Sequence, residues 1–169
     1  PVFNADVEVA KLYRKSRKCY NKLKKKLPNY ITSFPVKKIE LSKAIIANRK
    51  NLKKIIKIIH PEVRSRMNSF IKKNKKKKFV ILDIPLLMEN KINKKNDILI
   101  FVDAKKKEIN KRLKKKFNIN LKILEKFKKL QLPVELKKQQ SDFIIKNNFR
   151  NNSIKKNVKK VLEKILLNA

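Results

Sequence analysis

Short apolar runs constrain the fold of this chain more than any other feature. Three occur, at residues 79–84, 98–102 and 143–145, and all are rich in Ile, Leu, Val and Phe. Runs without polar alternation are typical of parallel strands that are covered on both faces. Stretches with helical spacing separate them, and this order predicts a parallel sheet with right-handed crossovers. We therefore expect a single α/β domain over residues 1–169.

The segment before the first apolar run is mainly helical in its spacing. Residues 7–27 carry apolar side chains near one face of a helix. Residues 41–59 continue this spacing as one bent helix or two, with residues 48–51 as the weak point. Pro61 is expected to end that helix and to begin another over residues 62–73, because the residue before a proline avoids the helical region.

The remaining elements follow from the same patterns. Val2 and Phe3 are interpreted as the end of a strand, with a turn after them. Residues 106–116 and 121–130 are predicted helices. A last amphipathic helix follows, with Ser153 as its N-cap.

None of the 169 residues is glycine. A glycine-rich phosphate loop, a dinucleotide fingerprint and a nucleophile elbow are therefore excluded from these residues. The formal net charge is +36, which suggests nucleic-acid binding. Lys, Asn and Ile recur together while glycine is absent, so we interpret AT-rich base composition as the main source of this charge.

The single cysteine and the short apolar runs indicate where in the cell the protein is expected. Cys19 is the only cysteine, so an internal disulfide is impossible, and a lone thiol fits a reducing, cytoplasmic location. No apolar run approaches the roughly 20 residues that a membrane helix needs. We therefore expect no membrane partner.

Acidic residues stand where three predicted strands end. Asp6 follows the first strand, Asp83 lies late in the second, and Asp103 follows the third. Each could simply cap a helix, because Asp does so well. Ligands of open parallel sheets bind beyond the carboxyl ends of the strands. Together these residues predict one ligand-binding rim.

The most specific segment is residues 81–90, where a strand runs into Pro-Leu-Leu-x-Glu. This segment resembles dephospho-CoA kinase, a P-loop kinase of coenzyme A synthesis. Further landmarks follow in that family's order: Pro1–Asp6, Ile59–Arg64, Val102–Ala104 with Arg112, then Gln131, Lys137, Ser141, Asp142 and Asn147. The resemblance covers nearly the whole chain.

The resemblance implies a P-loop NTPase-type parallel sheet flanked by helices. A helical substrate-binding part is implied at about residues 7–78, core strands at 79–104, a helical lid at about 105–130, and the last strand and C-terminal helix at 131–169. The family's first strand and its Gly-x-x-x-x-Gly-Lys-Ser/Thr loop are absent from these residues. We therefore expect a fragment of a longer product, rather than a decayed gene, that does not catalyse by itself.

The implied reaction transfers the γ-phosphate of ATP, with Mg²⁺, to the ribose 3′-hydroxyl of dephospho-CoA, which gives coenzyme A. Asp6 is the implied carboxylate that orients the hydroxyl or accepts its proton. It alternatively caps the helix from Val7, and both roles can hold together. Arg112 is expected to grip the transferring phosphate with its planar fork. Lys115 and Lys116 stand where the family's lid carries a second Arg.

The remaining site residues also come from the resemblance. The wall of the dephospho-CoA site is implied at His60, Pro61, Arg64, Leu86, Leu87 and Glu89. Asn147 is implied to contact adenine, although Asn also favours turns. Asn4 replaces the family's first acid, Lys105 replaces a common proline, and no glycine follows Asn147. We expect the Mg²⁺ ligands mainly in the absent loop, and no metal site in these residues.

Two other functions stay open on sequence alone. One is another small P-loop kinase, for a nucleoside or a nucleotide, against which Pro85–Glu89 weighs. The other is a non-enzymatic basic protein that binds nucleic acid. It should show aromatic side chains among its basic residues, but the chain is 7% aromatic and has no Trp. The expected partners are therefore dephospho-CoA and ATP and no specific nucleic acid, with the oligomeric state left open.

Overall fold

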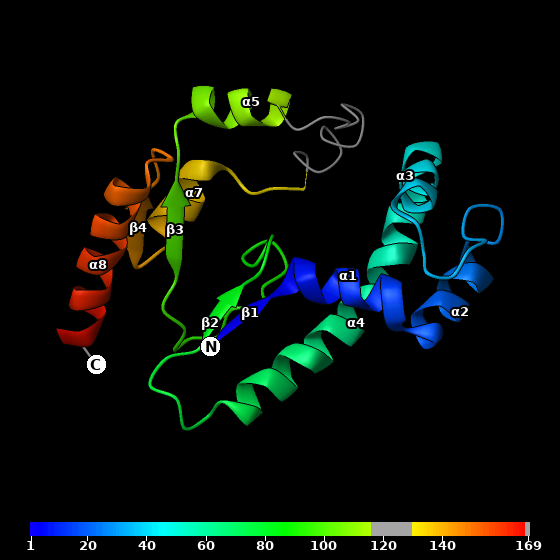
Figure 1. The fold of residues 1–169 in the computed structure, drawn as a ribbon, viewed down its shortest axis with the longest axis horizontal. Helices are drawn as coiled ribbons and strands as arrows, with labels where there is room; N and C mark the ends of the chain where they lie inside the picture. Colours follow the sequence, from blue (N-terminus) through cyan, green and yellow to red (C-terminus); the bar gives the residue numbers. More distant parts are fainter. Residues whose placement is uncertain (116–129, 168–169) are drawn as a thin grey trace. The chain divides into compact units, whose positions relative to one another are not determined.

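The computed structural model describes residues 1–115 and 130–167 (Figure 1). The chain divides into two compact units, Pro1–Pro85 and Leu86–Ala169. The first unit contains β1 (Val2–Asn4), α1 (Ala5–Lys15), α2 (Arg17–Lys26), α3 (Lys38–Ala47), α4 (Arg49–Lys73) and β2 (Ile81–Asp83). The second unit contains β3 (Ile100–Asp103), α5 (Lys106–Lys115), α7 (Val134–Gln139), β4 (Phe143–Lys146) and α8 (Asn151–Leu167).

A two-stranded parallel sheet joins the two ends of the first unit. β1 pairs with β2 so that Val2 lies opposite Ile81 and Asn4 lies opposite Asp83. Helices α1 to α4 form the long crossover that a parallel pair requires. The α/β class and the parallel pairing are confirmed. The described strands form two separate two-stranded sheets rather than the single expected sheet.

The first helical segment is two helices and not the single helix predicted for residues 7–27. α1 ends at Lys15, and α2 begins at Arg17 after an extended residue, Ser16. The Ser16 hydroxyl accepts a hydrogen bond from the Cys19 N–H at 3.2 Å and so caps α2. Apolar spacing continues through the break because both helices bury one side in the same core. Periodicity alone therefore did not reveal the break.

α3 and α4 are separate helices, which decides between the two alternatives left open by the sequence. α3 ends at Ala47, and the extended Asn48 caps α4 by accepting a hydrogen bond from the Lys50 N–H at 2.8 Å. The Asn51 side-chain amide donates to the Ala44 carbonyl oxygen at 3.0 Å. Side chains thus satisfy backbone groups on both sides of the break.

α4 is one helix of 25 residues that passes through Pro61. The prediction that Pro61 separates two helices is therefore wrong. Proline removes a backbone hydrogen bond and usually kinks or breaks a helix. Here buried side chains lie both before and after it, with Ile59 at 3% and Met67 at 7% exposure. Packing of both halves outweighs the local preference.

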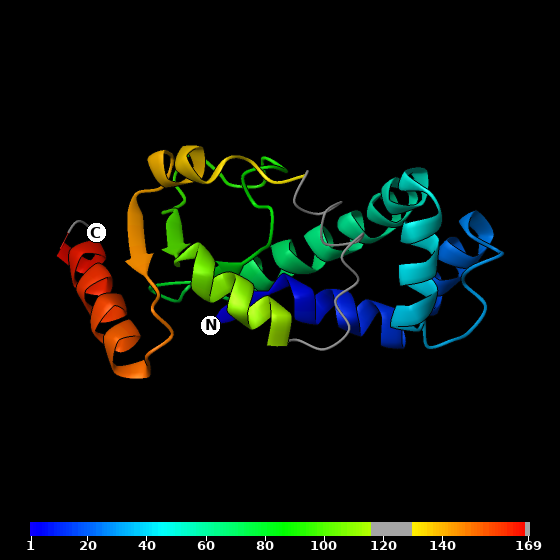
Figure 2. The same cartoon turned by 90° about the horizontal axis from the view of Figure 1, so that it is seen from above.

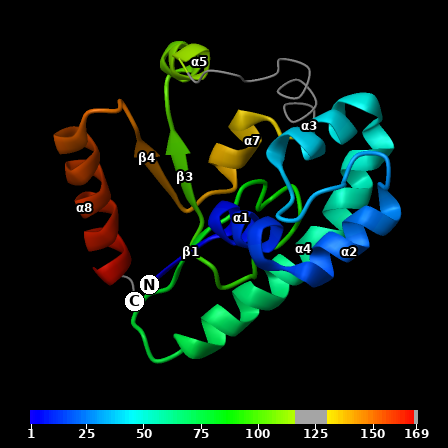
Figure 3. The same ribbon diagram turned by 45° about the vertical axis from the view of Figure 1, so that its right-hand side comes forward.

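The core of the first unit lies between α4 and the three helices that pack on it. Figure 2 shows α1 running beside α4, and Figure 3 shows α2 beside it. The buried side chains come from all four helices and from the loop between α2 and α3: Leu12, Cys19, Tyr20, Leu23, Leu27, Ile31, Val36, Leu41, Ala44, Ile55 and Ile59. The cysteine is therefore a packing residue.

Glu40 is a buried acid at the edge of this core. Its carboxylate accepts hydrogen bonds from the Thr32 N–H and hydroxyl and from the Ser33 N–H at 2.7 to 3.1 Å, and from the Lys37 N–H at 3.2 Å. Burial alone would raise the pKa of Glu40, but these hydrogen bonds outweigh it and lower the pKa to about 2. Glu40 thus anchors the loop that precedes α3. The sequence pattern did not single it out.

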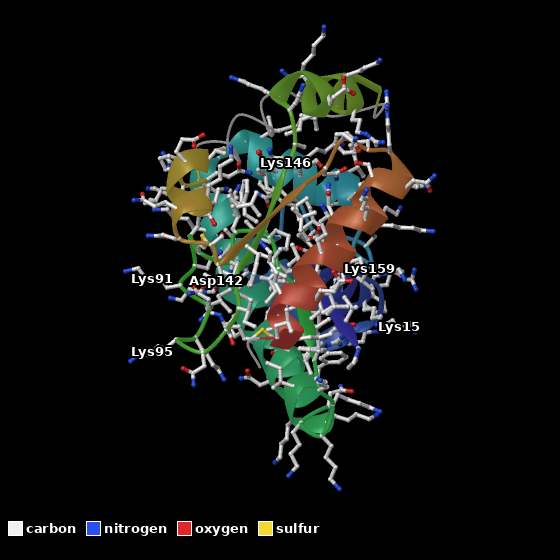
Figure 4. The ribbon with its side chains drawn as sticks, turned by 90° about the vertical axis from the view of Figure 1, so that its left-hand side faces the viewer. Lys15, Lys91, Lys95, Asp142, Lys146 and Lys159 are labelled. Carbon is white, nitrogen blue, oxygen red and sulfur yellow. The ribbon has the colours of Figure 1, made fainter. Side chains whose placement is uncertain are left out.

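The second unit is built on the parallel pair of β3 and β4. Ile100 lies opposite Phe143, and Asp103 lies opposite Lys146. α8 packs against β4, as Figure 3 also shows, and buries Ile165. Lys91 and Lys95, in the loop region before β3, point outward in Figure 4.

Several details of the second unit differ from expectation. The strands were predicted to be covered on both faces, but Ile100 is 44% and Val102 is 55% exposed, since alternate side chains of this two-stranded sheet are uncovered. α8 begins at Asn151, so Ser153 lies in its first turn and is not the N-cap. The predicted helix at residues 121–130 lies almost wholly outside the described residues.

No helix within residues 1–115 and 130–167 is both long and apolar enough to cross a membrane.

Candidate active site

The carboxyl ends of β1 and β2 carry two polar side chains in direct contact. The Asn4 side-chain amide donates to the Asp83 carboxylate at 2.6 Å. The Asn4 side-chain oxygen accepts a hydrogen bond from the Val7 N–H at 2.9 Å and caps α1. The helix cap considered for Asp6 is therefore made by Asn4, because its side chain reaches the third residue of the helix.

Asp6 lies in the first turn of α1, directly after the end of β1, and is exposed. The carboxylate of nearby Glu8, in contrast, accepts hydrogen bonds from Lys11 at 2.6 Å and from Arg66 at 2.8 Å. These bonds, first from Lys11 and then from Arg66, lower the pKa of Glu8. No described residue makes such a bond to the carboxylate of Asp6, so that group is open to a ligand.

His60, Pro61 and Arg64 lie in the middle of α4. His60 and Arg64 are four residues apart and share one helix face. Burial and then the charge of Arg64 lower the pKa of His60. The imidazole is therefore neutral near pH 7 and can both donate and accept a hydrogen bond.

Glu62 has a role that the sequence did not predict. It lies on a different face of α4 from His60, since two residues rotate a helix by about 200°. Its carboxylate pairs with Lys18 at 2.8 Å and with Lys22 at 3.5 Å, both in α2. The hydrogen bond from Lys18 lowers the pKa of Glu62. These bonds tie α2 to α4 on that other face.

Residues 86–92 form a compact turn at the start of the second unit. Leu86 has a left-handed backbone (φ 56°), and its carbonyl oxygen accepts the N–H and the side-chain amide of Asn90 at 3.1 and 2.8 Å. The Ile92 N–H donates to the Leu87 carbonyl oxygen at 3.2 Å. Leu86 and Leu87 are half-buried. The turn gives the two leucines fixed positions.

Glu89, in the same turn, is held by the chain around α7. One carboxylate oxygen accepts the Leu132 N–H at 3.0 Å and Lys137 Nζ at 3.2 Å. Burial alone would raise the pKa of Glu89, but hydrogen bonds from its own N–H, from Leu132 and from Lys137 lower it. The hydrogen bonds of this carboxylate are thus made to other groups of the protein. Its contacts therefore support a role in positioning the turn better than the predicted contact with substrate.

Replacing Lys137 with Met should destabilise the second unit by about 2 kcal/mol, because the Glu89 carboxylate, 9% exposed, keeps its burial and loses its cation. Urea unfolding at pH 7 measures this change. Lys159→Met is the matched control, since its pair with Glu163 is exposed and 3.9 Å long and should change stability by less than about 0.5 kcal/mol. Equal losses in the two variants would contradict the assigned role of Glu89.

The carboxyl end of β3 carries Asp103. Its carboxylate pairs with Lys138 at 3.3 Å, and its carbonyl oxygen accepts the Asn147 N–H at 2.7 Å. At the opposite end of the sheet, the Asp142 carboxylate accepts the Leu99 N–H at 2.7 Å. That Asp6, Asp83 and Asp103 share one rim stays a prediction.

The loop from β4 to α8 is built by asparagine side chains. The Asn147 side-chain oxygen accepts the Phe149 N–H at 2.8 Å, and that of Asn148 accepts the Arg150 N–H at 3.1 Å. Phe149 has a left-handed backbone (φ 60°), which costs a residue with a side chain roughly 1–2 kcal/mol. An open pocket of about 500 Å³ is lined by Phe149, Arg150, Asn151, Asn152 and Ser153.

Arg112, in α5, reaches this loop. The centre of its guanidinium lies 4.0 Å from the centroid of the Phe149 ring. The structure thus brings together two parts of the sequence-based site, Arg112 and the loop that follows Asn147. Lys115 is the last residue of α5. Lys116 lies outside the described residues.

Comparisons with known proteins show the family to which this chain belongs. The family model described as dephospho-CoA kinase matches residues 1–155. The chain belongs to the dephospho-CoA kinase family. Two curated relatives named dephospho-CoA kinase match 99% of this chain. The relative from the Wolbachia of Brugia malayi is 30% identical over 87% of its own length, and that from Bartonella quintana is 32% identical over 86%.

Two solved structures share the fold of this family member. TT1252 from Thermus thermophilus aligns with a TM-score of 0.71 at 21% identity, over 97% of this chain and 84% of its own. Dephospho-CoA kinase from Campylobacter jejuni aligns with a TM-score of 0.61 at 22% identity, over 99% of this chain and 86% of its own.

The described part of this dephospho-CoA kinase family member contains no group of three His, Cys, Asp or Glu side chains that could hold a metal ion. Mg²⁺ in phosphoryl-transfer enzymes is usually held by one or two carboxylates together with substrate phosphates. A group of three such side chains is therefore not required for Mg²⁺ to bind together with substrate phosphates.

Proposed function

We propose that this protein transfers the γ-phosphate of ATP to the ribose 3′-hydroxyl of dephospho-CoA and so completes coenzyme A synthesis. The observation that carries the proposal is the match of the dephospho-CoA kinase family model to residues 1–155. Relatives of that name at about 30% identity match nearly the whole chain. Two kinds of group are needed for this chemistry: a carboxylate for the hydroxyl and cations for the phosphate.

Asp6 is the proposed carboxylate. It is exposed at the carboxyl end of β1, and Asn4 rather than Asp6 caps α1. Asp6 would orient the attacking hydroxyl and accept its proton.

Arg112 is the proposed ligand of the transferring phosphate, with Lys115 and Lys116 as further cations. A guanidinium holds phosphate through two parallel N–H bonds, which an ammonium cannot do. The centre of the Arg112 guanidinium lies over the Phe149 ring, 4.0 Å from its centroid. The N–H groups at the edge of a guanidinium that stacks on a ring would remain available to an anion.

His60, Pro61, Arg64, Leu86 and Leu87 are the proposed wall of the dephospho-CoA site. His60 is half-buried and Pro61 and Arg64 are exposed in the middle of α4, and the two leucines lie in one hydrogen-bonded turn. A neutral His60 would bind by hydrogen bonding, and Arg64 would attract phosphate groups. Apolar side chains with a few polar ones suit an adenosine–pantetheine ligand.

Asn147 is the proposed contact for the adenine of ATP. Its side-chain oxygen already holds the Phe149 N–H, so the contact would use its amide N–H₂ group or the loop that it shapes. The open pocket over residues 149–153 lies beside it. Its volume of about 500 Å³ falls within the range of small-ligand sites.

The phosphate-binding loop of this fold needs glycine, because its backbone N–H groups must approach the phosphates closely. None of the 169 residues is glycine. We propose that residues outside this sequence supply the loop and most of the Mg²⁺ contacts. Codons for Gly-x-x-x-x-Gly-Lys-Ser/Thr upstream of Pro1 would support this, and an in-frame start codon immediately before Pro1 would contradict it.

An acceptor panel tests the proposed substrate. The intact protein is incubated with ATP and either dephospho-CoA or one of several nucleosides and nucleoside monophosphates, and ADP release is followed. We expect release that depends on dephospho-CoA and not on the other acceptors. Preference for a nucleoside monophosphate would instead favour a nucleotide kinase.

A further inference from the structure

The loop from β4 to α8 places a phenylalanine where the backbone favours glycine. Phe149 has a φ of 60°, in the left-handed region that residues with a Cβ atom avoid. Bulky residues in this conformation persist only where the surrounding structure fixes them, and such positions cluster at functional sites. The turn alone does not account for a phenylalanine at position 149, where glycine would fit without strain.

Hydrogen bonds on both sides of Phe149 fix this conformation. On the strand side, Asn147 donates its N–H to the Asp103 carbonyl oxygen at 2.7 Å and holds the Phe149 N–H with its side chain at 2.8 Å. On the helix side, the Asn148 side chain holds the Arg150 N–H at 3.1 Å and donates to the Ser153 hydroxyl at 3.1 Å. The loop is thus tied to both β3 and α8, and its backbone at Phe149 is held from both sides.

The ring that this loop presents lies against Arg112. The guanidinium centre is 4.0 Å from the ring centroid, well within cation–π range. Stacking of this kind uses the flat face of the guanidinium and leaves its N–H edge pointing along the ring plane. A phosphate in that plane can then accept two N–H bonds from Arg112.

We propose that Phe149 is a positioning residue that orients the Arg112 guanidinium for the phosphates of the bound nucleotide. The inference rests on the proposed function, because Arg112 is a phosphate ligand there. Phe149 does not itself need to touch the nucleotide. Its ring restricts the rotamers of a long, exposed side chain before the nucleotide arrives, which reduces the entropy lost on binding.

A double-mutant cycle on ATP affinity tests the proposal, and it needs no assumption about the acceptor. Titration calorimetry of the intact protein measures the dissociation constant for ATP in wild type, Phe149→Leu, Arg112→Ala and the double variant. We expect Phe149→Leu to weaken ATP binding about three- to fivefold, the loss of one exposed cation–π contact. In the Arg112→Ala background, Phe149→Leu should have no further effect. An equal loss in both backgrounds would overturn the proposal.

Two further variants separate positioning from a purely structural role. Phe149→Tyr keeps the stacked ring and should keep wild-type ATP affinity. Phe149→Gly relieves the left-handed backbone, so the free energy of unfolding should stay the same or rise while ATP affinity falls. If Phe149→Gly lost stability and affinity together, the ring would be a packing residue only. Failure of the proposed function would appear separately, as tight ATP binding without transfer to dephospho-CoA.

Discussion

Replacing Asp6 with Asn should lower the turnover of phosphate transfer by about a hundred- to ten-thousandfold, the usual contribution of a general base. The change removes the charge and the proton-accepting oxygen at the end of β1 and keeps the shape. The KM for ATP should change little, because Asp6 is proposed to act on the hydroxyl of the acceptor. Steady-state kinetics with dephospho-CoA and ATP measure both constants.

Glu8→Gln is the matched control for this variant. Glu8 lies in the same first turn of α1 and contributes the same charge to the helix N-terminus. Its carboxylate is bound to Lys11 and Arg66, so the control should lose some stability and keep wild-type turnover. If Asp6→Asn retained full turnover, or if both variants lost it equally, Asp6 would not be the base.

Replacing Glu40 with Gln should lower the free energy of unfolding by about 3 kcal/mol at pH 7. This figure follows from a pKa lowered from its usual 4.5 to about 2 in the folded protein. The physical cause is the set of N–H and hydroxyl groups of Thr32, Ser33 and Lys37 that donate to both carboxylate oxygens. The Gln side chain has only one acceptor oxygen, and its NH₂ group is a donor that cannot replace the second oxygen.

The pH dependence of this effect has a definite sign. A lowered carboxyl pKa stabilises the fold above the unfolded value of about 4.5, and the contribution is lost as pH falls toward 2. Urea unfolding at pH 7, 4 and 3 should therefore show wild type and Glu40→Gln converging at low pH. Glu163→Gln, at an exposed pair, should match wild type throughout. A constant gap between wild type and Glu40→Gln would contradict the role of Glu40.

Strands were the elements best predicted from the sequence. Residues 81–83, 100–103 and 143–146 fall within or beside the three apolar runs, because β-branched runs of this length rarely form anything else in an α/β protein. The apolar runs do not show, however, which strands pair with one another or what covers them. Sequence therefore did not show that the described strands form two pairs, or that Ile100 and Val102 are exposed.

The predictions of helix boundaries were wrong where tertiary packing opposes the local conformational preference of the residues. Pro61 predicted a break, but buried residues on both sides keep α4 continuous. Ser16 interrupts the first helix although the apolar spacing continues through it. For Ser16 the sequence did contain a usable signal, since serine is among the residues preferred at helix N-caps.

The sequence predicted which residues form the candidate site, but it did not predict which contacts those residues make. Asp6 and Arg112 were predicted from the motifs, whereas the contact of Asn4 with Asp83, the Glu89–Lys137 pair and the contact of Phe149 with Arg112 were not. These three contacts join residues that are 79, 48 and 37 positions apart in sequence. Only a folded structure brings such partners together.

The proposed reaction is tested most directly by the product itself. The intact protein is incubated with ATP labelled in the γ-phosphate and with dephospho-CoA, and the product is identified by mass spectrometry and phosphorus NMR. We predict that the label is transferred to the ribose 3′-hydroxyl, which gives coenzyme A. Label that stays in ATP, or that appears at another hydroxyl or on a nucleoside monophosphate, would contradict the proposed function.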